Sequence, residues 1–100
     1  MINGMRALHP AEVLQEDYLK PLGLSVNALA KALDVPASRM NDIVHARRGV
    51  SADTALRLER YVGSDAQGWL NLQTVYDLKV AQKAGSKASA KAIFPSAFAA

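Results

Sequence analysis

The 100-residue sequence predicts a small all-α protein of five helices. Apolar residues recur three and four positions apart in successive segments, which is the spacing of one helix face, and no segment alternates as a half-buried strand would. Several of these segments follow a residue that can cap helix amides, and one ends at a glycine. The two central segments are separated by Asp34 and Val35, and so short a connection predicts a helix-turn-helix motif.

The first predicted helix opens at Pro10 and runs to about Lys20. We expect Pro21 to end it, because proline has no amide hydrogen to donate inside a helix. Glu12 lies in its first turn, where an acidic side chain complements the helix dipole. Its inner face consists of Val13, Leu14 and Tyr18.

The second and third predicted helices form the helix-turn-helix motif. Ser25 can cap the second helix, and Pro36 occupies the first helical position of the third, where its missing amide hydrogen costs nothing. The short connection makes the two helices cross steeply, pack through their apolar faces and leave the outer face of the third helix free. These apolar faces consist of Leu29, Ala30 and Leu33 in the second helix and Met40, Ile43 and Val44 in the third.

The fourth predicted helix is capped by Ser51 and carries Asp53 in its first turn. Gly63 ends it, at the position where a left-handed residue is wanted. Its apolar side chains are Ala55, Leu58 and Val62, with Leu56 and Tyr61 beside them.

The fifth predicted helix begins at a capping box formed by Ser64 and Gln67, and we expect it to end near Lys83, before Gly85. Apolar side chains cover more than half of its circumference, which is too wide a surface for one small core. Another copy of the chain is the commonest partner for such a surface, so we expect a homodimer. The predicted dimer interface consists of Trp69, Leu72, Val75, Tyr76 and Leu78.

The domain organisation follows from these helices. Residues 1–83 form the predicted helix-turn-helix and dimerisation domain. Residues 84–100 contain lysines but no acidic residue, and this composition predicts a weakly structured C-terminal tail, in which Ile93, Phe94 and Phe98 are the side chains able to dock.

The composition excludes several classes of function. The sequence contains no cysteine, which rules out disulfides, thiolate chemistry and zinc fingers. Its apolar stretches are far shorter than the roughly 20 residues of a membrane-spanning helix. The N-terminus also lacks the apolar core of a signal peptide, so we expect a cytoplasmic protein without membrane contact.

No arrangement of residues in the sequence indicates an enzyme. A nucleophile with its base, a phosphate-binding glycine loop and a carboxylate pair with a pocket are all missing, so no catalytic residue is predicted. His9 and His45 lie far apart without further ligands nearby, so neither a metal nor another cofactor is expected. His9 is expected as a surface or capping residue before the first helix.

The outer face of the third helix carries small and hydrogen-bonding side chains, of the kind that reach base edges in the major groove of DNA. The predicted base contacts are Ala37, Ser38, Arg39, Asn41 and Asp42. Arg39 is the leading candidate, because a guanidinium can bond guanine bidentately, although it could equally bind phosphate. We expect Asp42 to orient Arg39 through an ion pair, ahead of the alternative that it accepts from a cytosine amino group.

Cationic and polar side chains lie around this face, while the net charge of the chain is only +3. The predicted phosphate contacts are Ser25, Asn27, His45, Arg47 and Arg48. Acidic side chains gather instead in the first helix, at Glu12, Glu16 and Asp17, which gives the molecule a cationic and an acidic side.

Several short motifs between His9 and Leu78 add to this interpretation. They are HP at 9–10, PLGLS at 21–25, VPxSRxNxI at 35–43, RG at 48–49, SADTALRL from 51 and WLNLQxxYDL from 69. With these motifs, about two thirds of the chain resembles the HigA-type antitoxins within the lambda-repressor-like (Xre) helix-turn-helix group.

The resemblance implies a five-helix homodimer that represses its own operon through a palindromic operator in double-stranded DNA and neutralises a RelE-like ribonuclease toxin. It assigns the reading helix to residues 37–44, with Ser38, Arg39 and Asn41 at groove positions and a basic loop after it. The chain departs from the family at two places. Asp34 stands where the family usually has glycine, and His45-Ala46 stands where it favours Asn-Gly.

Two alternatives stay open at this point. The chain could be an orphan regulator of the same fold without a toxin, or a protein-interaction module that does not bind DNA. If a toxin exists, the acidic face of the first helix is the surface we expect to meet it.

Overall fold

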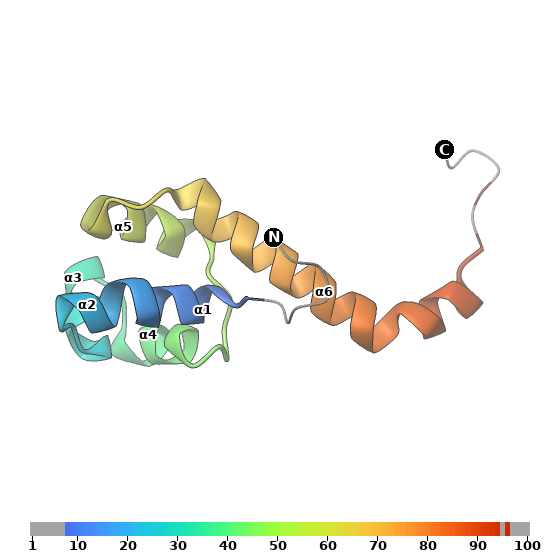
Figure 1. The fold of residues 1–100 in the computed structure, drawn as a ribbon, viewed down its shortest axis with the longest axis horizontal. Helices are drawn as coiled ribbons and strands as arrows, with labels where there is room; N and C mark the ends of the chain where they lie inside the picture. The colour runs from blue at the N-terminus through green and yellow to red at the C-terminus, as the bar shows by residue number, and fades with distance from the viewer. Residues whose placement is uncertain (1–7, 95, 97–100) are drawn as a thin grey trace.

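The computed structural model describes residues 8–94 and 96, and this part of the chain consists of helices joined by short turns (Figure 1). The elements are α1 (Pro10–Val13), η1 (Leu14–Leu19), α2 (Lys20–Leu22), α3 (Val26–Leu33), α4 (Ala37–Val44), α5 (Ala52–Val62) and α6 (Ala66–Ala92). The first three form one continuous helix, so five helices are present in the described residues. The predicted all-α fold is confirmed.

The first helix was expected to end at Pro21, but this prediction is wrong. The helix continues to Leu22 and ends at Gly23, which has φ 66°. Before the proline, Leu14–Leu19 form a π-helix, and the amide of Lys20 donates to the carbonyl of Gln15, five residues back. Inside an α-helix, the ring of a proline clashes with the carbonyl four residues before it. The proline nitrogen also has no hydrogen to donate to that carbonyl. The wider π turn directly before Pro21 accommodates both defects, so the helix passes through the proline.

The core lies between the first helix, α3, α4 and α5, and the start of α6 closes it. The apolar faces predicted for α3 and α4 are buried. In α5, Leu58 is fully buried, whereas Leu56 and Tyr61 are about half exposed. The largest fully buried apolar side chains are Leu14, Leu29, Met40, Ile43 and Leu58. The packing of α3 on α4 holds the helix-turn-helix motif, and α5 supports it from the side of α3.

The start of α6 differs from the predicted capping box. The hydroxyl of Ser64 accepts from the indole Nε1 of Trp69 at 2.6 Å, because a buried indole needs an acceptor. The carboxylate of Asp65 caps the helix in its place, accepting from the amide of Gly68 at 3.2 Å. Gln67 donates to Asn71 along the helix and not back to the cap.

The C-terminal end of α6 lies further along the chain than the sequence predicts. The helix continues past Lys83 and through Gly85 to Ala92. Residues 84–92 are rich in alanine, the best helix former, which compensates for the single glycine. The proposed domain boundary after residue 83 therefore falls inside a helix.

The outer part of α6 projects from the domain (Figure 1), and the radius of gyration is 16.6 Å, against about 13 Å for a compact chain of this length. Ile93 and Phe94 are 69% and 83% exposed, so neither docks on the domain. Phe98 lies outside the described residues. Within the described residues, no helix has both the length and the apolar character needed to cross a membrane.

Candidate nucleic-acid interface

The turn between α3 and α4 has the geometry that the sequence predicts. Ser25 caps α3, its hydroxyl accepting from the amide of Ala28 at 3.0 Å. Asp34 ends α3 in the left-handed region, with φ 57° and ψ 48°. Aspartate tolerates this conformation better than most residues, so it can replace the glycine usual in the family.

Pro36 lies one position earlier in its helix than expected. Its ψ of 140° is extended, and its carbonyl accepts from the amide of Met40 at 3.1 Å. These are the properties of an N-cap residue, so α4 begins at Ala37. The shift leaves the outer face of α4 unchanged.

All five predicted base contacts lie on the outer side of α4. Met40, Ile43 and Val44 are at most 4% exposed and anchor the inner side. On the outer side Ala37, Ser38 and Asn41 are exposed, whereas Arg39 and Asp42 are partly buried. Among the described residues Arg39 has no hydrogen bond or ion pair, so its guanidinium is available to an external acceptor.

The expected ion pair between Asp42 and Arg39 is wrong, because Asp42 binds Arg47 instead, with 3.0 Å between Oδ1 and Nε. The backbone explains this pairing. The amides of Arg47 and Arg48 donate to the carbonyl of Asp42 at 2.8 and 3.2 Å, which folds the loop back over the end of α4. Asp42 therefore partly neutralises Arg47 and leaves Arg39 free.

The loop after α4 contains a strained alanine. Ala46 has φ 60°, a conformation that costs an L-residue with a Cβ roughly 1–2 kcal/mol. His45 precedes it, and its Nδ1 lies 2.8 Å from the carbonyl of Asn41. The loop thus keeps a left-handed residue where the family favours glycine, and Arg47 and Arg48 follow it, both exposed.

Three side chains hold this interface in place, and reasoning from the sequence missed all of them. Gln15 donates from Nε2 to the carbonyl of Val44 at 2.7 Å, which fixes the C-terminal end of α4. Gln73 accepts from the amide of Val50 at 2.8 Å, which fixes the loop after α4. A Cβ at Gly49 would lie 2.9 Å from the Cδ atom of Gln73, so this approach is close.

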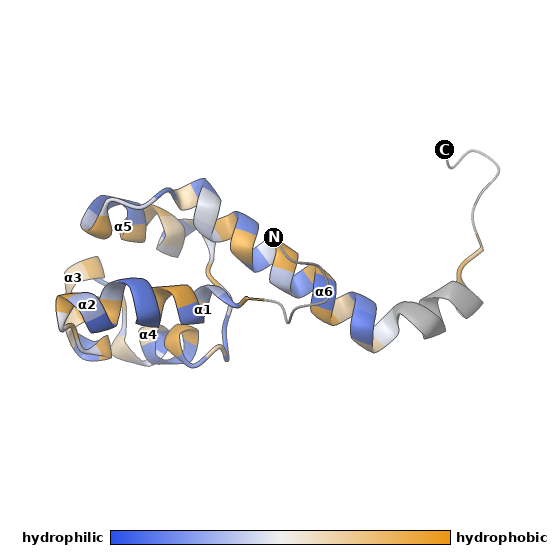
Figure 2. Ribbon diagram, in the orientation of Figure 1, coloured by the Kyte–Doolittle hydropathy of each residue, from blue (hydrophilic) through white to orange (hydrophobic). Residues whose placement is uncertain are grey.

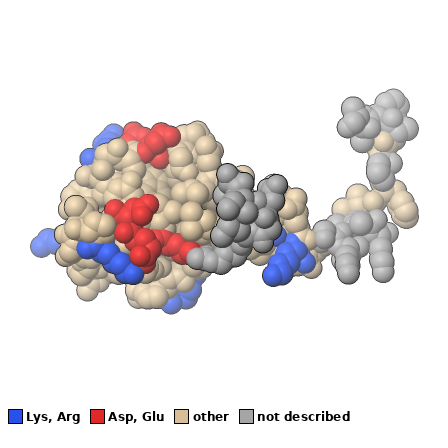
Figure 3. Space-filling view, viewed as in Figure 1, with Lys and Arg blue, Asp and Glu red and all other residues tan. Residues whose placement is uncertain are grey.

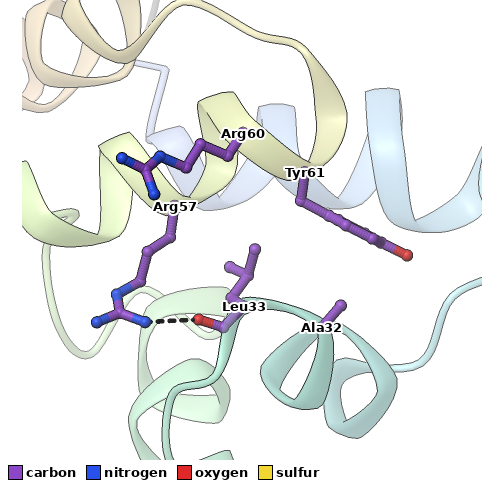
Figure 4. A pocket seen from close by; sticks show the side chains of 5 residues that line it. All are labelled: Ala32, Leu33, Arg57, Arg60 and Tyr61. Carbon is purple, nitrogen blue, oxygen red and sulfur yellow. Dashed lines mark hydrogen bonds between the residues drawn. The ribbon is translucent and has the colours of Figure 1, made fainter.

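The third side chain is Arg57, which reaches from α5 to the turn before α4 (Figure 4). Its Nη1 donates to the carbonyls of Leu33 at 2.9 Å and Asp34 at 3.2 Å, while its Nε pairs with Asp53 at 2.9 Å. Arg57 also lines a hollow of about 300 Å³ between α3 and α5, beside Arg60. The only sequence signal for Arg57 and Gln73 was their presence in the SADTALRL and WLNLQxxYDL motifs.

Comparison with known proteins shows to which family the chain belongs. No protein-family model matches the sequence. The chain is 60% identical over 93 residues to Virulence-associated protein I of Dichelobacter nodosus, covering 93% of this chain and 84% of that protein. Antitoxin GraA is 41% identical with a TM-score of 0.89, covering 93% of this chain and 100% of GraA. Antitoxin HigA of Pseudomonas aeruginosa, solved with the higBA promoter, is 46% identical with a TM-score of 0.84, covering 90% and 98% of the two chains.

The chain belongs to the HigA family of helix-turn-helix antitoxins. The resemblance inferred from the motifs is therefore confirmed, and at the level of the family these are antitoxins and transcriptional regulators, not enzymes.

The predicted dimer face of this HigA-family protein is only partly exposed. Trp69 is 3% exposed and packs against Tyr18 at 5.7 Å between ring centroids, so it belongs to the core of its own protomer. Leu72 and Tyr76 are partly buried. Val75 is 50% exposed and Leu78 57% exposed. These two side chains form an apolar surface on α6 without a cover in the described part of the chain (Figure 2), whereas Val80, 46% exposed, lies about 160° around the helix from Leu78.

His9 joins the first helix to α6. It is 5% exposed, its Nδ1 accepts from the amide of Ala11 at 2.9 Å, and its ring meets that of Tyr76 edge-on at 4.5 Å. Burial lowers the pKa of His9 below its ordinary 6.5, and the carboxylates of Asp77 and Glu12 oppose this shift. The expectation of a capping residue is confirmed, but the side chain is buried and not on the surface.

The charges of the molecule are only partly separated into the predicted cationic and acidic sides. Figure 3 shows acidic side chains gathered over the first helix, and Lys and Arg at the lower margin, where α4 lies in Figure 1. Figure 3 also shows acidic atoms at the upper margin of the domain and cationic atoms beside the first helix. Glu16 pairs with Lys20, and Asp17 is exposed beside them. No group of three potential metal ligands occurs among the described residues.

Proposed function

We propose that this HigA-family protein is a sequence-specific DNA-binding repressor that lays α4 in the major groove of a palindromic operator. The observation that carries the proposal is the outer face of α4, where hydrogen-bonding side chains surround an unpaired Arg39. GraA has been solved with its operator, and HigA of P. aeruginosa with the higBA promoter. Both relatives support the same use of the motif in this chain.

The proposed base contacts are those predicted from the sequence: Ala37, Ser38, Arg39, Asn41 and Asp42. The proposed phosphate contacts are Ser25, Asn27, His45, Arg47 and Arg48. Arg48 is the stronger of the two loop arginines, because Arg47 shares its charge with Asp42. Arg39 carries the specificity, since bidentate bonding to guanine discriminates between bases by about 1–3 kcal/mol.

The proposed assembly is a homodimer formed through the exposed apolar side chains of α6, with Val75 and Leu78 at the centre of the interface. A two-fold axis between the protomers would place two copies of α4 about one helical turn of DNA, or 34 Å, apart. This spacing is what a palindromic operator requires.

The proposed partner besides DNA is a RelE-like ribonuclease toxin, which the antitoxin neutralises while repressing its own operon. Membership of the HigA family supports a toxin partner. The exposed carboxylates of the first helix, Glu16 and Asp17, are the proposed surface for a basic toxin. Reversing both charges should abolish toxin binding, and unchanged toxin binding would exclude this surface.

The proposal is tested by measuring the affinity of the full chain for its own upstream region and for random duplex at physiological salt. We expect the upstream region to bind at least about 10³-fold more tightly, as specific DNA readers do. Equal affinities for the upstream region and for random duplex would rule out a sequence-specific repressor. A repressor that binds its operator but has no toxin gene beside its own would instead be an orphan regulator.

A further inference from the structure

A row of lysines follows α6 as the helix leaves the domain. Lys79 and Lys83 are four residues apart, and the sequence repeats lysine at the next two such steps, Lys87 and Lys91. In an α-helix each step of four residues advances about 6 Å along the axis and turns about 40° around it, so the four positions span about 18 Å of length and about 120° of the circumference. No acidic residue follows Asp77 in the sequence.

The row lies on the side of α6 that faces the body of the domain. At about 100° per residue, the helix places Leu72 about 20° from Lys79, and Tyr76 about 20° from Lys83. Leu72 and Tyr76 are the partly buried residues that turn toward the domain. Of the two residues at the centre of the proposed dimer face, Leu78 lies about 100° from Lys79 and Val75 about 40° from it, so the lysine row borders that face without coinciding with it.

The lysines also share a side of the molecule with the proposed reading helix. In Figure 3 the cationic atoms of α6 lie along its lower side, and the lower margin of the domain, beside α4, is cationic as well. Lys83 is exposed and Lys79 partly exposed. Among the described residues neither lysine has an ion pair, so both charges are available.

We propose that this lysine row binds the phosphates of DNA that flanks the operator, as a second nucleic-acid contact beside the helix-turn-helix motif. The inference rests on the proposed function, since it needs the protein on DNA. A solvated helix face ordinarily mixes charges of both signs, whereas this row is purely cationic. Duplex DNA presents one negative charge per roughly 1.7 Å, enough to engage every lysine of an 18 Å row.

The acidic face of a second copy is the other surface that the row would attract. That face is small, and its carboxylate at Glu16 already pairs with Lys20. DNA therefore matches the length and charge of the row better.

The experiment compares the full-length wild type with the double variant Lys79→Ala and Lys83→Ala and with the variant in which all four lysines are alanine. A control double variant, Lys20→Ala and Lys31→Ala, removes the same charge as the first from exposed positions on α2 and α3. Each protein is titrated with two duplexes of the upstream region. One covers the footprint alone, and the other extends it by about ten base pairs, one helical turn, on each side.

We expect the extended duplex to bind the wild type more tightly than the short one, and the quadruple variant to lose this gain. Each phosphate contact contributes about 0.9 to the slope of log affinity against log salt concentration. The first double variant removes two lysines from each protomer of the proposed dimer, so raising salt from 50 to 200 mM should cost the wild type about 10²-fold more affinity for the extended duplex than it costs this variant. The control double variant should keep the wild-type slope.

The lysine contact would be overturned if the wild type and the quadruple variant had the same salt slope and the same gain in affinity from the longer duplex. The proposed repressor function would still stand if the protein preferred the upstream region over random duplex. A fall in dimer mass on sedimentation, without a change in slope, would assign the row to the second copy and equally overturn the proposal. A wild type that binds upstream and random DNA alike would instead contradict the proposed function itself.

Discussion

Arg39 is the residue on which sequence reading depends. Its guanidinium lies on the outer face of α4 without a partner among the described residues, since Asp42 is engaged by Arg47. Replacing Arg39 by Ala should cost about 1–3 kcal/mol for the operator and relax the preference at one base position. Affinities for a panel of single-base operator variants measure this. Arg48→Ala is the matched comparison, expected to weaken all sequences alike.

A uniform loss of affinity across the panel in the Arg39 variant would make Arg39 a phosphate contact. The specificity would then rest on the polar side chains of Ser38 and Asn41, which share the outer face.

Ala46 stores strain in the loop that presents the basic residues. Because its φ is 60°, Ala46→Gly should raise the free energy of unfolding by about 1 kcal/mol, the relief of strain exceeding the entropy that glycine adds to the unfolded chain. Urea unfolding measures the change. The same substitution at exposed Ala32 within α3 should lower stability by a similar amount. If both variants lose stability, Ala46 is not strained.

His9 makes stability depend on pH. Its pKa is lowered by burial, so the folded protein binds this proton less tightly than the unfolded chain does. The contribution of neutral His9 is complete above about pH 6.5 and is lost as pH falls through the lower pKa of the folded state. Replacing His9 by Asn, which can also cap a helix, should therefore flatten the decline of unfolding free energy as the pH falls below about 6.5. An unchanged decline in urea unfolding would contradict this role.

At the scale of the elements, features set by neighbouring residues were predictable. The cap at Ser25 and the left-handed ends at Asp34 and Gly63 follow from the side chains present, and the structure has all three. The short connection likewise determines that α3 and α4 pack closely and that the outer face of α4 is exposed. The location of the candidate interface was therefore readable from the sequence.

Features that depend on contacts between distant segments were not predictable in the same way. Ser64 looked like a cap, but the indole of Trp69 uses its hydroxyl. The pairing of Asp42 with Arg47 depends on how the loop folds back. The hydrogen bonds of Gln15 and Gln73 join residues 29 and 23 positions apart in the sequence, and no local sequence pattern predicts them.

The turn before α4 depends on α5 through Arg57. Because its Nη1 serves the carbonyls of Leu33 and Asp34, Arg57→Ala should leave both without this donor and lower the free energy of unfolding by about 1–3 kcal/mol. Urea unfolding of Arg60→Ala, an exposed arginine on the same helix, provides the control and should change little. Equal effects of the two substitutions would mean that Arg57 does not stabilise the turn.

At the scale of the whole molecule, a single protomer offers one reading helix and one uncovered apolar surface. Val75 and Leu78 are about half exposed on one face of α6, and a second copy is the occupant we propose. Two copies of α4 would then read the two halves of one palindrome. Dimerisation and specificity are thus parts of the same proposal.

The most direct test of this proposal is hydroxyl-radical footprinting of the full chain on its own upstream region. We predict two protected patches of related, inverted sequence whose centres lie about one helical turn, or 34 Å, apart. A single patch, or uniform protection along the duplex, would contradict the symmetric repressor.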